Sequence, residues 1–476
     1  MRRIVGYDYI IASFILITFS CVSITNIFSC SSKYYVTALL PIVYILGFFV
    51  WGVWSSNNAV LLKKLIMLLM AIKMVLIPGL ILINHGLVVS GFDSNIYKYI
   101  PDAVILQIIE YTIVIIYITF LNWTKYSIDN NPIAIEGNDN EMIASRSAWR
   151  ILGVCIVIII GTIVVYPSFL NRLRPIFFVN ETAEILWKQK ADIALNSLPA
   201  VLYYPLNWLF LESRLALAYM VIVKLYNSRV RLSDGIKLFL SLVSTIVILI
   251  LIVPDSVATS VYAALTLFLL LYMFYPGKRK SIVFVVTAVC IAVLIGAFVI
   301  MPMTSGRGIS ISYIASKLNA YFSGYLNTSA AVAMNNYSSS RFEMLAGDFL
   351  RSLPIVRGFF TSMPMSNELF NMALGYDTIY NSQIIPLEGQ GYYYLRHVGT
   401  ILFTILHMHI LKNYYYKMLN TRSSFTFFIY GTLTLLMTFG LVMYGLFLNF
   451  SLVLSQIPLL LINYLFVRRY IVNHKY

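Results

Sequence analysis

Five arginines gather in one polar stretch of an otherwise apolar chain. They are Arg307, Arg341, Arg351, Arg357 and Arg396, and His397 directly follows the last of them. A guanidinium group donates several hydrogen bonds from a planar fork that matches the oxygens of a phosphate. Arginines grouped beside a membrane therefore suit a lipid-linked pyrophosphate. The competing interpretation is a solvated surface, on which each arginine forms an ordinary ion pair with an acidic residue of the same stretch.

Two segments of this stretch have helical patterns. Ser340-Arg341-Phe342-Glu343 has the form of a capping box, which predicts a helix over about 341–353. Residues 313–336 also predict a helix, with Tyr321 and Tyr325 among its aromatic positions. Such helices could lie on the outer leaflet and form a groove whose tyrosines contact sugar rings and whose serines and asparagines bond hydroxyl groups. The alternative is a helical cap that its tyrosines hold to the rest of the protein.

The elements that must position these residues are membrane spans. Of 476 residues, 60% are hydrophobic and only 11% are charged, whereas soluble domains carry about 25% charged residues. A soluble globule and a disordered chain are both excluded. A spanning helix needs about 20 apolar residues. The sequence predicts an all-α polytopic membrane protein with about twelve spans, at 7–28, 34–54, 61–84, 103–124, 149–168, 203–226, 237–253, 257–275, 281–301, 392–411, 425–444 and 446–467.

These spans divide the chain into three parts. A bundle of nine spans covers residues 1–301, a large external helical loop covers 302–391, and three further spans occupy 392–476. Lysine and arginine are more frequent in the loops on the side of the two termini, which predicts that this side is cytoplasmic. We therefore expect a multi-pass protein of the cytoplasmic (inner) membrane, with both termini inside and residues 302–391 outside.

Four ionisable residues fall inside the predicted spans, namely Lys73, Glu110, Glu212 and Arg214. A charge within the membrane is a hypothesis of function by default. For Glu212 and Arg214 the alternative is that the span at 203–226 is shifted and both lie near the membrane surface. The five histidines form no ligand cluster, so neither a metal nor another cofactor is expected. Basic residues cluster at span ends and not on one face, so nucleic acid is not an expected partner.

Two segments carry a resemblance to a known family. The sequence LNAYFSGY at 318–325 resembles the Y-(F/L)-S-G segment of bacterial oligosaccharide repeat-unit polymerases, the Wzy-type O-antigen polymerases. The sequences GQGYYY at 389–394 and RHVG at 396–399 resemble the Gly/Tyr-rich entry to the span after the external loop in that family. The layout of spans around one dominant external loop is similar too. An arginine followed after ten residues by a glycine, which some relatives contain, is absent from the long loop.

The resemblance implies a metal-independent membrane glycosyltransferase for O-antigen, capsular or other exopolysaccharide. A glycan on undecaprenyl pyrophosphate would move onto the non-reducing end of a new lipid-linked repeat unit at the outer face of the membrane. The five arginines, Arg396 foremost, would bind the leaving pyrophosphate. A carboxylate or histidine would accept the proton of the attacking hydroxyl. The candidate bases are His397, Glu343 and Asp348, with Glu388 behind them, and the sugar-contact candidates are Tyr321, Tyr325 and Tyr392.

The expected partners are the lipid-linked oligosaccharide, the membrane, a chain-length regulator and a flippase. The same residues are also compatible with two other functions. An O-antigen ligase has nearly the same layout and would use an external histidine such as His397. A repeat-unit flippase also has many spans, but its work needs a charged central cavity and short loops. The few charges within spans and the long loop argue against it.

Overall fold

The computed structural model describes residues 7–54, 61–86, 94–120, 199–228, 232–253, 257–296, 310–337, 340–375, 384–421 and 423–461, with scattered positions at 150–175, 299 and 303. These residues form helices, apart from one pair of two-residue strands, β1 (Arg174–Pro175) and β2 (Ile252–Val253), which pair antiparallel. The all-helical class that the composition predicts is therefore confirmed.

The first half of the chain supplies helices that the sequence predicts as spans. In order they are α1 (Tyr7–Thr25), α2 (Leu39–Trp54), α3 (Leu61–Ala71), the π-helical turn η3 (Ile72–Leu76), α4 (Ile77–Ile83) and α5 (Ile100–Phe120). Then come α9 (Ala200–Tyr226), α10 (Asp234–Thr245), the π-helical turn η7 (Ile246–Leu251), α11 (Val257–Phe274) and α12 (Arg279–Ile295). The short turns η1 (Asn26–Ser29), η2 (Ser32–Ala38), η4 (Ser94–Tyr99) and η8 (Pro276–Lys278) connect or precede them.

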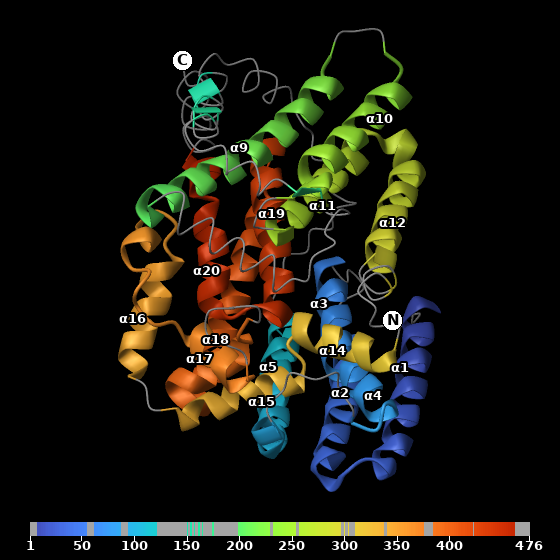
Figure 1. The fold of residues 1–476 in the computed structure, drawn as a ribbon. Coiled ribbons are helices and arrows are strands. Elements are labelled where there is room, and N and C mark those ends of the chain that lie inside the picture. Colours follow the sequence, from blue (N-terminus) through green and yellow to red (C-terminus); the bar gives the residue numbers. More distant parts are fainter. Residues whose placement is uncertain are drawn as a thin grey trace.

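The second half begins with short helices and ends with longer ones. The short ones are α14 (Ile311–Tyr321), α15 (Tyr325–Ala333), η10 (Met334–Asn336), α16 (Arg341–Ser352), η11 (Val356–Phe359) and α17 (Ser366–Ala373). The chain continues through α18 (Leu387–Leu419), α19 (Ser424–Met443) and α20 (Leu446–Ser455). Helices α18, α19 and α20 occupy the middle of the molecule, with α1–α5 at one end and α9–α12 at the other (Figure 1).

Among these residues, five helices are long and apolar enough to cross a membrane. They cover Ser32–Gly52, Leu62–Ile83, Ile96–Phe120, Val201–Tyr226 and Ser424–Met443, and they correspond to five of the predicted spans. A bent pair, Val261–Phe274 and Pro276–Ala292, turns by 110° and makes a sixth if it is one span. The structure thus supports a membrane protein with five or six such helices. Most of the predicted span at 149–168 lies outside the described residues.

The helices of the 302–391 region match one sequence prediction and correct another. Helix α16 begins where the capping box predicts, and the Ser340 hydroxyl accepts a hydrogen bond from the Glu343 amide at 3.4 Å. A single helix over 313–336 is wrong, because the chain breaks between α14 and α15 at residues 322–324. Ser323 there has φ +46°, a left-handed conformation that ends a helix.

Helix α18 is two helical segments joined at a sharp kink. Leu395 (φ −131°, ψ 22°) and Arg396 (φ 56°, ψ −147°) interrupt the helical backbone. We call residues 387–394 the entry segment of α18. Gly391 in this segment touches the backbone of Gly399 beyond the kink, since a Cβ on Gly391 would stand 2.5 Å from the Gly399 carbonyl oxygen. Glycine at both positions is therefore what allows the entry segment to fold back against the rest of α18.

Candidate functional site

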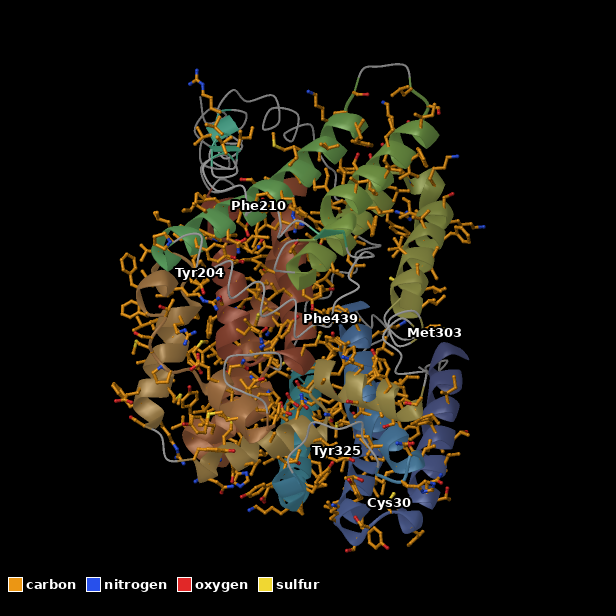
Figure 2. The ribbon with its side chains drawn as sticks, viewed as in Figure 1. Cys30, Tyr204, Phe210, Met303, Tyr325 and Phe439 are labelled. Carbon is orange, nitrogen blue, oxygen red and sulfur yellow. The ribbon has the colours of Figure 1, made fainter. Side chains whose placement is uncertain are left out.

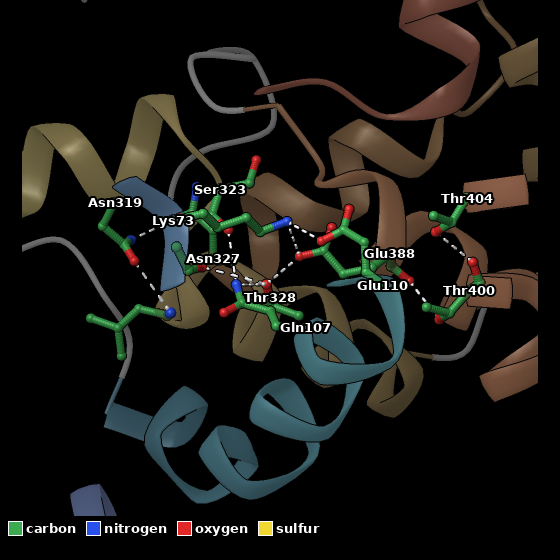
Figure 3. Close-up of polar contacts among 12 residues, drawn as sticks. Lys73, Gln107, Glu110, Asn319, Ser323, Asn327, Thr328, Glu388, Thr400 and Thr404 are labelled. Atoms are coloured by element: carbon green, nitrogen blue, oxygen red, sulfur yellow. Dashed lines mark hydrogen bonds and ion pairs between the residues drawn. The ribbon is translucent and has the colours of Figure 1, made fainter. Parts of the chain in front are cut away.

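One lysine and two glutamates form an ionic cluster that is fully buried in the described structure. Lys73 comes from the π-helical turn η3, Glu110 from α5 and Glu388 from the entry segment of α18. The Lys73 ammonium lies 2.5 Å from Glu110 Oε2 and 2.9 Å from Glu388 Oε1. Each side chain is at most 1% exposed. Figure 3 shows the two carboxylates meeting at the lysine Nζ.

Neutral polar groups from three helices complete this cluster. The Thr328 hydroxyl of α15 donates to Glu388 Oε1 at 2.8 Å, and it accepts from Gln107 Nε2 at 3.0 Å. Gln107 also donates to the Ser323 carbonyl at 3.0 Å, and Thr400 beyond the kink donates to the Glu388 carbonyl at 2.9 Å. The cluster thus joins two membrane helices to the α14–α15 turn and to both sides of the α18 kink.

Asn319 explains the shape of the α14–α15 turn. Its side-chain amide donates to Asn327 Oδ1 at 2.9 Å, and its oxygen accepts from the Leu326 amide at 3.3 Å. Gly324 fits closely against Asn319, where any side chain would collide. Residues 323–325 are consequently a buried turn next to the ionic cluster, whereas Tyr321 of the same segment is exposed.

A second group of predicted residues lies at the kink of α18. Arg396 and His397 are exposed, and Tyr392 is half-buried between them and the core. The Arg396 guanidinium stands 5.4 Å from the centre of the Tyr392 ring, and the His397 ring meets the same tyrosine edge-on at 5.3 Å. Within the described residues Arg396 has no carboxylate partner in an ion pair. Among the described residues, therefore, no carboxylate neutralises its positive charge.

The other arginines do not all converge on this place. Arg341 donates to Asn335 Oδ1 at 3.1 Å and stands 5.9 Å from the Tyr393 ring, so it too contacts the entry segment. Arg351 instead pairs with Glu368 at 2.7 Å, and Arg357 lies 4.7 Å from the ring of Tyr204 on α9. Figure 2 labels Tyr204 on α9, the helix that packs against η11. Arg307 lies outside the described residues.

Asp348, a candidate base, is the centre of a buried hydrogen-bond hub. It accepts from the Ser366 amide at 3.0 Å and from the Ser366 hydroxyl at 2.5 Å. It also accepts from Gln390 Nε2 at 2.9 Å and from the Tyr394 hydroxyl at 2.7 Å. Burial raises the pKa of Asp348, an effect that these four hydrogen bonds partly offset. The carboxylate is 1% exposed, and its four hydrogen bonds hold α16, α17 and the entry segment together.

The remaining candidates are spread over the surface and the core. Glu343 is exposed on α16, and Tyr321 is 58% exposed. Tyr325 is fully buried, and Figure 2 places it in the interior of the molecule. In its buried position Tyr325 contacts the core and not a surface groove.

The two charged residues of α9 are also enclosed. Glu212 is 4% exposed and Arg214 is 8% exposed, and Gln456 Nε2 donates to Glu212 Oε1 at 2.9 Å. Both residues lie within the apolar helix Val201–Tyr226, which corresponds to the predicted span.

Sequence reasoning found Lys73 and Glu110 as intramembrane charges and Glu388 as a lesser base candidate, but it did not join them. The available signal was that a buried lysine needs an acidic partner. Within the described part of the chain, no three histidine, cysteine or acidic side chains are grouped as metal ligands. No protein-family model, curated protein or solved structure matches this chain.

Proposed function

We propose that the protein polymerises lipid-linked oligosaccharide repeat units at the outer face of the cytoplasmic membrane. The proposal includes the finer topology expected from sequence: about twelve spans, cytoplasmic termini and an outward-facing 302–391 region. The substrates would be two undecaprenyl-pyrophosphate-linked glycans, of which one donates its chain to the other.

The observation that carries this proposal is the exposed surface at the α18 kink. Arg396 there is exposed and free of a carboxylate partner in the described structure. The next turns of α18 expose an apolar stripe on one helix face, formed by Val398, Ile401, Leu402 and Ile405. A cation directly above an apolar stripe suits a diphosphate that carries a polyprenyl chain.

The backbone at Arg396 supports the same interpretation. A φ of 56° with a ψ of −147° is a conformation that non-glycine residues rarely adopt. Strain of this kind clusters at binding and catalytic sites, where the surrounding structure holds it in place. Here the entry segment, fixed by the ionic cluster and by the Asp348 hub, holds Arg396 outward.

The residues at the kink supply the two needs of glycosyl transfer. In that reaction the acceptor hydroxyl oxygen bonds to the anomeric carbon of the donor while the bond to the pyrophosphate oxygen breaks. Arg396, together with Arg341 across the entry segment, would stabilise the charge on the leaving pyrophosphate. His397 would take the hydroxyl proton, and Tyr392 between them would contact the sugar ring. No step needs a metal or a nucleotide.

The two segments that resemble the polymerase family also support the proposal by their contact. The 318–325 segment and the entry segment of α18 lie far apart in sequence, yet they join one polar network: the Ser323 carbonyl accepts from Gln107, and Glu388 pairs with Lys73. The exposed His397 suits an O-antigen ligase as well, so ligase activity is the second candidate.

The test is to delete the gene and examine the glycan attached to lipid. Loss of a polymerase leaves single repeat units at the surface, loss of a ligase leaves long chains on undecaprenyl pyrophosphate, and loss of a flippase leaves no units outside. Complementation with Arg396→Ala should then fail to extend chains at normal protein level. Lys417→Ala is the matched control, because Lys417 is an exposed cation on the same helix that lies 5.3 Å from the Tyr430 ring. Normal chain length with Arg396→Ala would refute the assignment.

A further inference from the structure

The ionic cluster of Lys73, Glu110 and Glu388 has an unequal count of charges. One ammonium faces two carboxylates, and all three groups are withdrawn from solvent. An uncompensated charge in such a place costs several kcal/mol, far more than a typical favourable contact returns. One further positive charge is needed for balance.

The hydrogen bonds of the two carboxylates show where that charge belongs. Glu110 Oε2 and Glu388 Oε1 take the lysine, but Glu110 Oε1 and Glu388 Oε2 are buried without any hydrogen-bond donor. A buried acceptor without a donor is uncommon in native structures. The two carboxyl groups also contact the same ammonium, at 2.5 and 2.9 Å, so they lie side by side at the lysine.

The surroundings offer no other source of positive charge within the described structure. The charged groups that interact with Glu110 are Lys73 and Glu388, and those that interact with Lys73 are the same two glutamates. Gln107 and Thr328 contribute dipoles and hydrogen bonds but no charge. A metal ion would require several converging oxygen ligands, whereas a proton needs only one carboxylate oxygen.

We infer that Glu110 and Glu388 share one bound proton, which makes the cluster with Lys73 an electrically neutral proton-binding site inside the membrane bundle. The proton is the ligand that joins the entry segment of α18 to α5. This inference stands on the buried cluster alone and does not depend on glycosyl transfer.

Infrared spectroscopy tests the inference directly, because the carbonyl stretch of a protonated carboxyl group is distinct from that of a carboxylate and shifts in D2O. The full chain, purified at pH 7 in a detergent without ester groups, should show this band. Glu110→Gln should abolish the contribution of the site, and Glu388→Gln should abolish it equally, since either leaves one carboxylate for one ammonium. Glu343→Gln, at an exposed position on α16, is the control that should leave the band unchanged.

A second variant makes the test independent of the first two. Lys73→Met removes the ammonium, so both carboxyl groups must then be protonated and the contribution of the site should double. Glutamine has the size and neutrality of a protonated glutamate, so the first two variants are expected to fold, which circular dichroism checks. The inference is overturned if the wild-type chain gives no difference from the double Gln variant, or if the band survives either single substitution. If a metal cation were bound in place of the proton, the wild-type chain would give no difference from the double Gln variant.

Discussion

The strained backbone at Arg396 permits a prediction that separates the fold from the proposed chemistry. Arg396→Gly and Arg396→Ala both remove the guanidinium group, and both lose its contact with Tyr392. Alanine keeps a Cβ in the unfavourable conformation at φ 56°, whereas glycine adopts it readily. The two variants therefore differ in backbone strain and not in the interactions of the side chain.

The size of that difference follows from two opposing effects. A non-glycine residue in such a conformation costs about 1–3 kcal/mol. Glycine gives back about 0.4–1 kcal/mol, because it increases the conformational freedom of the unfolded chain. We expect Arg396→Gly to be more stable than Arg396→Ala by about 1 kcal/mol, while both fail to extend glycan chains.

The assay is reversible unfolding of each variant in mixed micelles, with the free energy of unfolding measured beside glycan length in complemented cells. Equal stability of the two variants would refute the claim of strain at this position. Activity in either variant would refute the role of the Arg396 side chain. The two parts of the reasoning can therefore fail separately.

Three further predictions concern other parts of the fold. Lys73→Met should lower the free energy of unfolding at pH 7 by about 3–5 kcal/mol, because both buried glutamates lose their counter-charge and must then bind protons. Lys64→Met, at an exposed position on the same helix, should change it by less than about 0.5 kcal/mol. Equal losses of stability in the two variants would contradict the role of Lys73 in the ionic cluster. Burial raises the pKa of Asp348, so the folded chain binds that proton more tightly than the unfolded chain, and the contribution of Asp348 to stability should be greatest below about pH 4 and fall as the pH rises above it. Asp348→Asn should remove this part of the pH dependence of the free energy of unfolding. An unchanged pH dependence in the variant would contradict the prediction. Gly399→Ala should cost about 2–3 kcal/mol, because its Cβ would enter the facing backbone. The Cβ of Gly235→Ala meets only a side-chain oxygen at 3.9 Å, so this variant should be tolerated; thermal unfolding of both variants checks the difference.

The features that sequence could predict are those that depend on neighbouring residues. Span-length helices such as Leu62–Ile83 and Ser424–Met443 follow from a local run of apolar side chains. The start of α16 follows from Ser340 and Glu343, which interact within one turn. A run of hydropathy does not say whether a helix bends, so the 110° turn after Phe274 was not predictable.

The features that sequence could not predict depend on contacts between distant segments. The break at Ser323 is stabilised by Gln107 of another helix, so the helical pattern over 313–336 gave no sign of it. Glu388 falls within the predicted loop at 302–391, and nothing near it in the sequence indicates that it pairs with Lys73. The positions of Arg351 and Arg357 away from Arg396 likewise follow from how α16 packs on α17 and how η11 packs on α9, which residue spacing does not encode.

The ionic cluster also sets an order of events while the chain is being made. Lys73 and Glu110 belong to helices that are synthesised early, and together they form a neutral pair that can enter the bilayer as a hairpin. Glu388 emerges only after more than half of the chain has followed. The late carboxyl group must then join a pair that is already neutral, so one more proton has to be bound at that stage. The core of the protein can therefore close only after most of the chain has been synthesised.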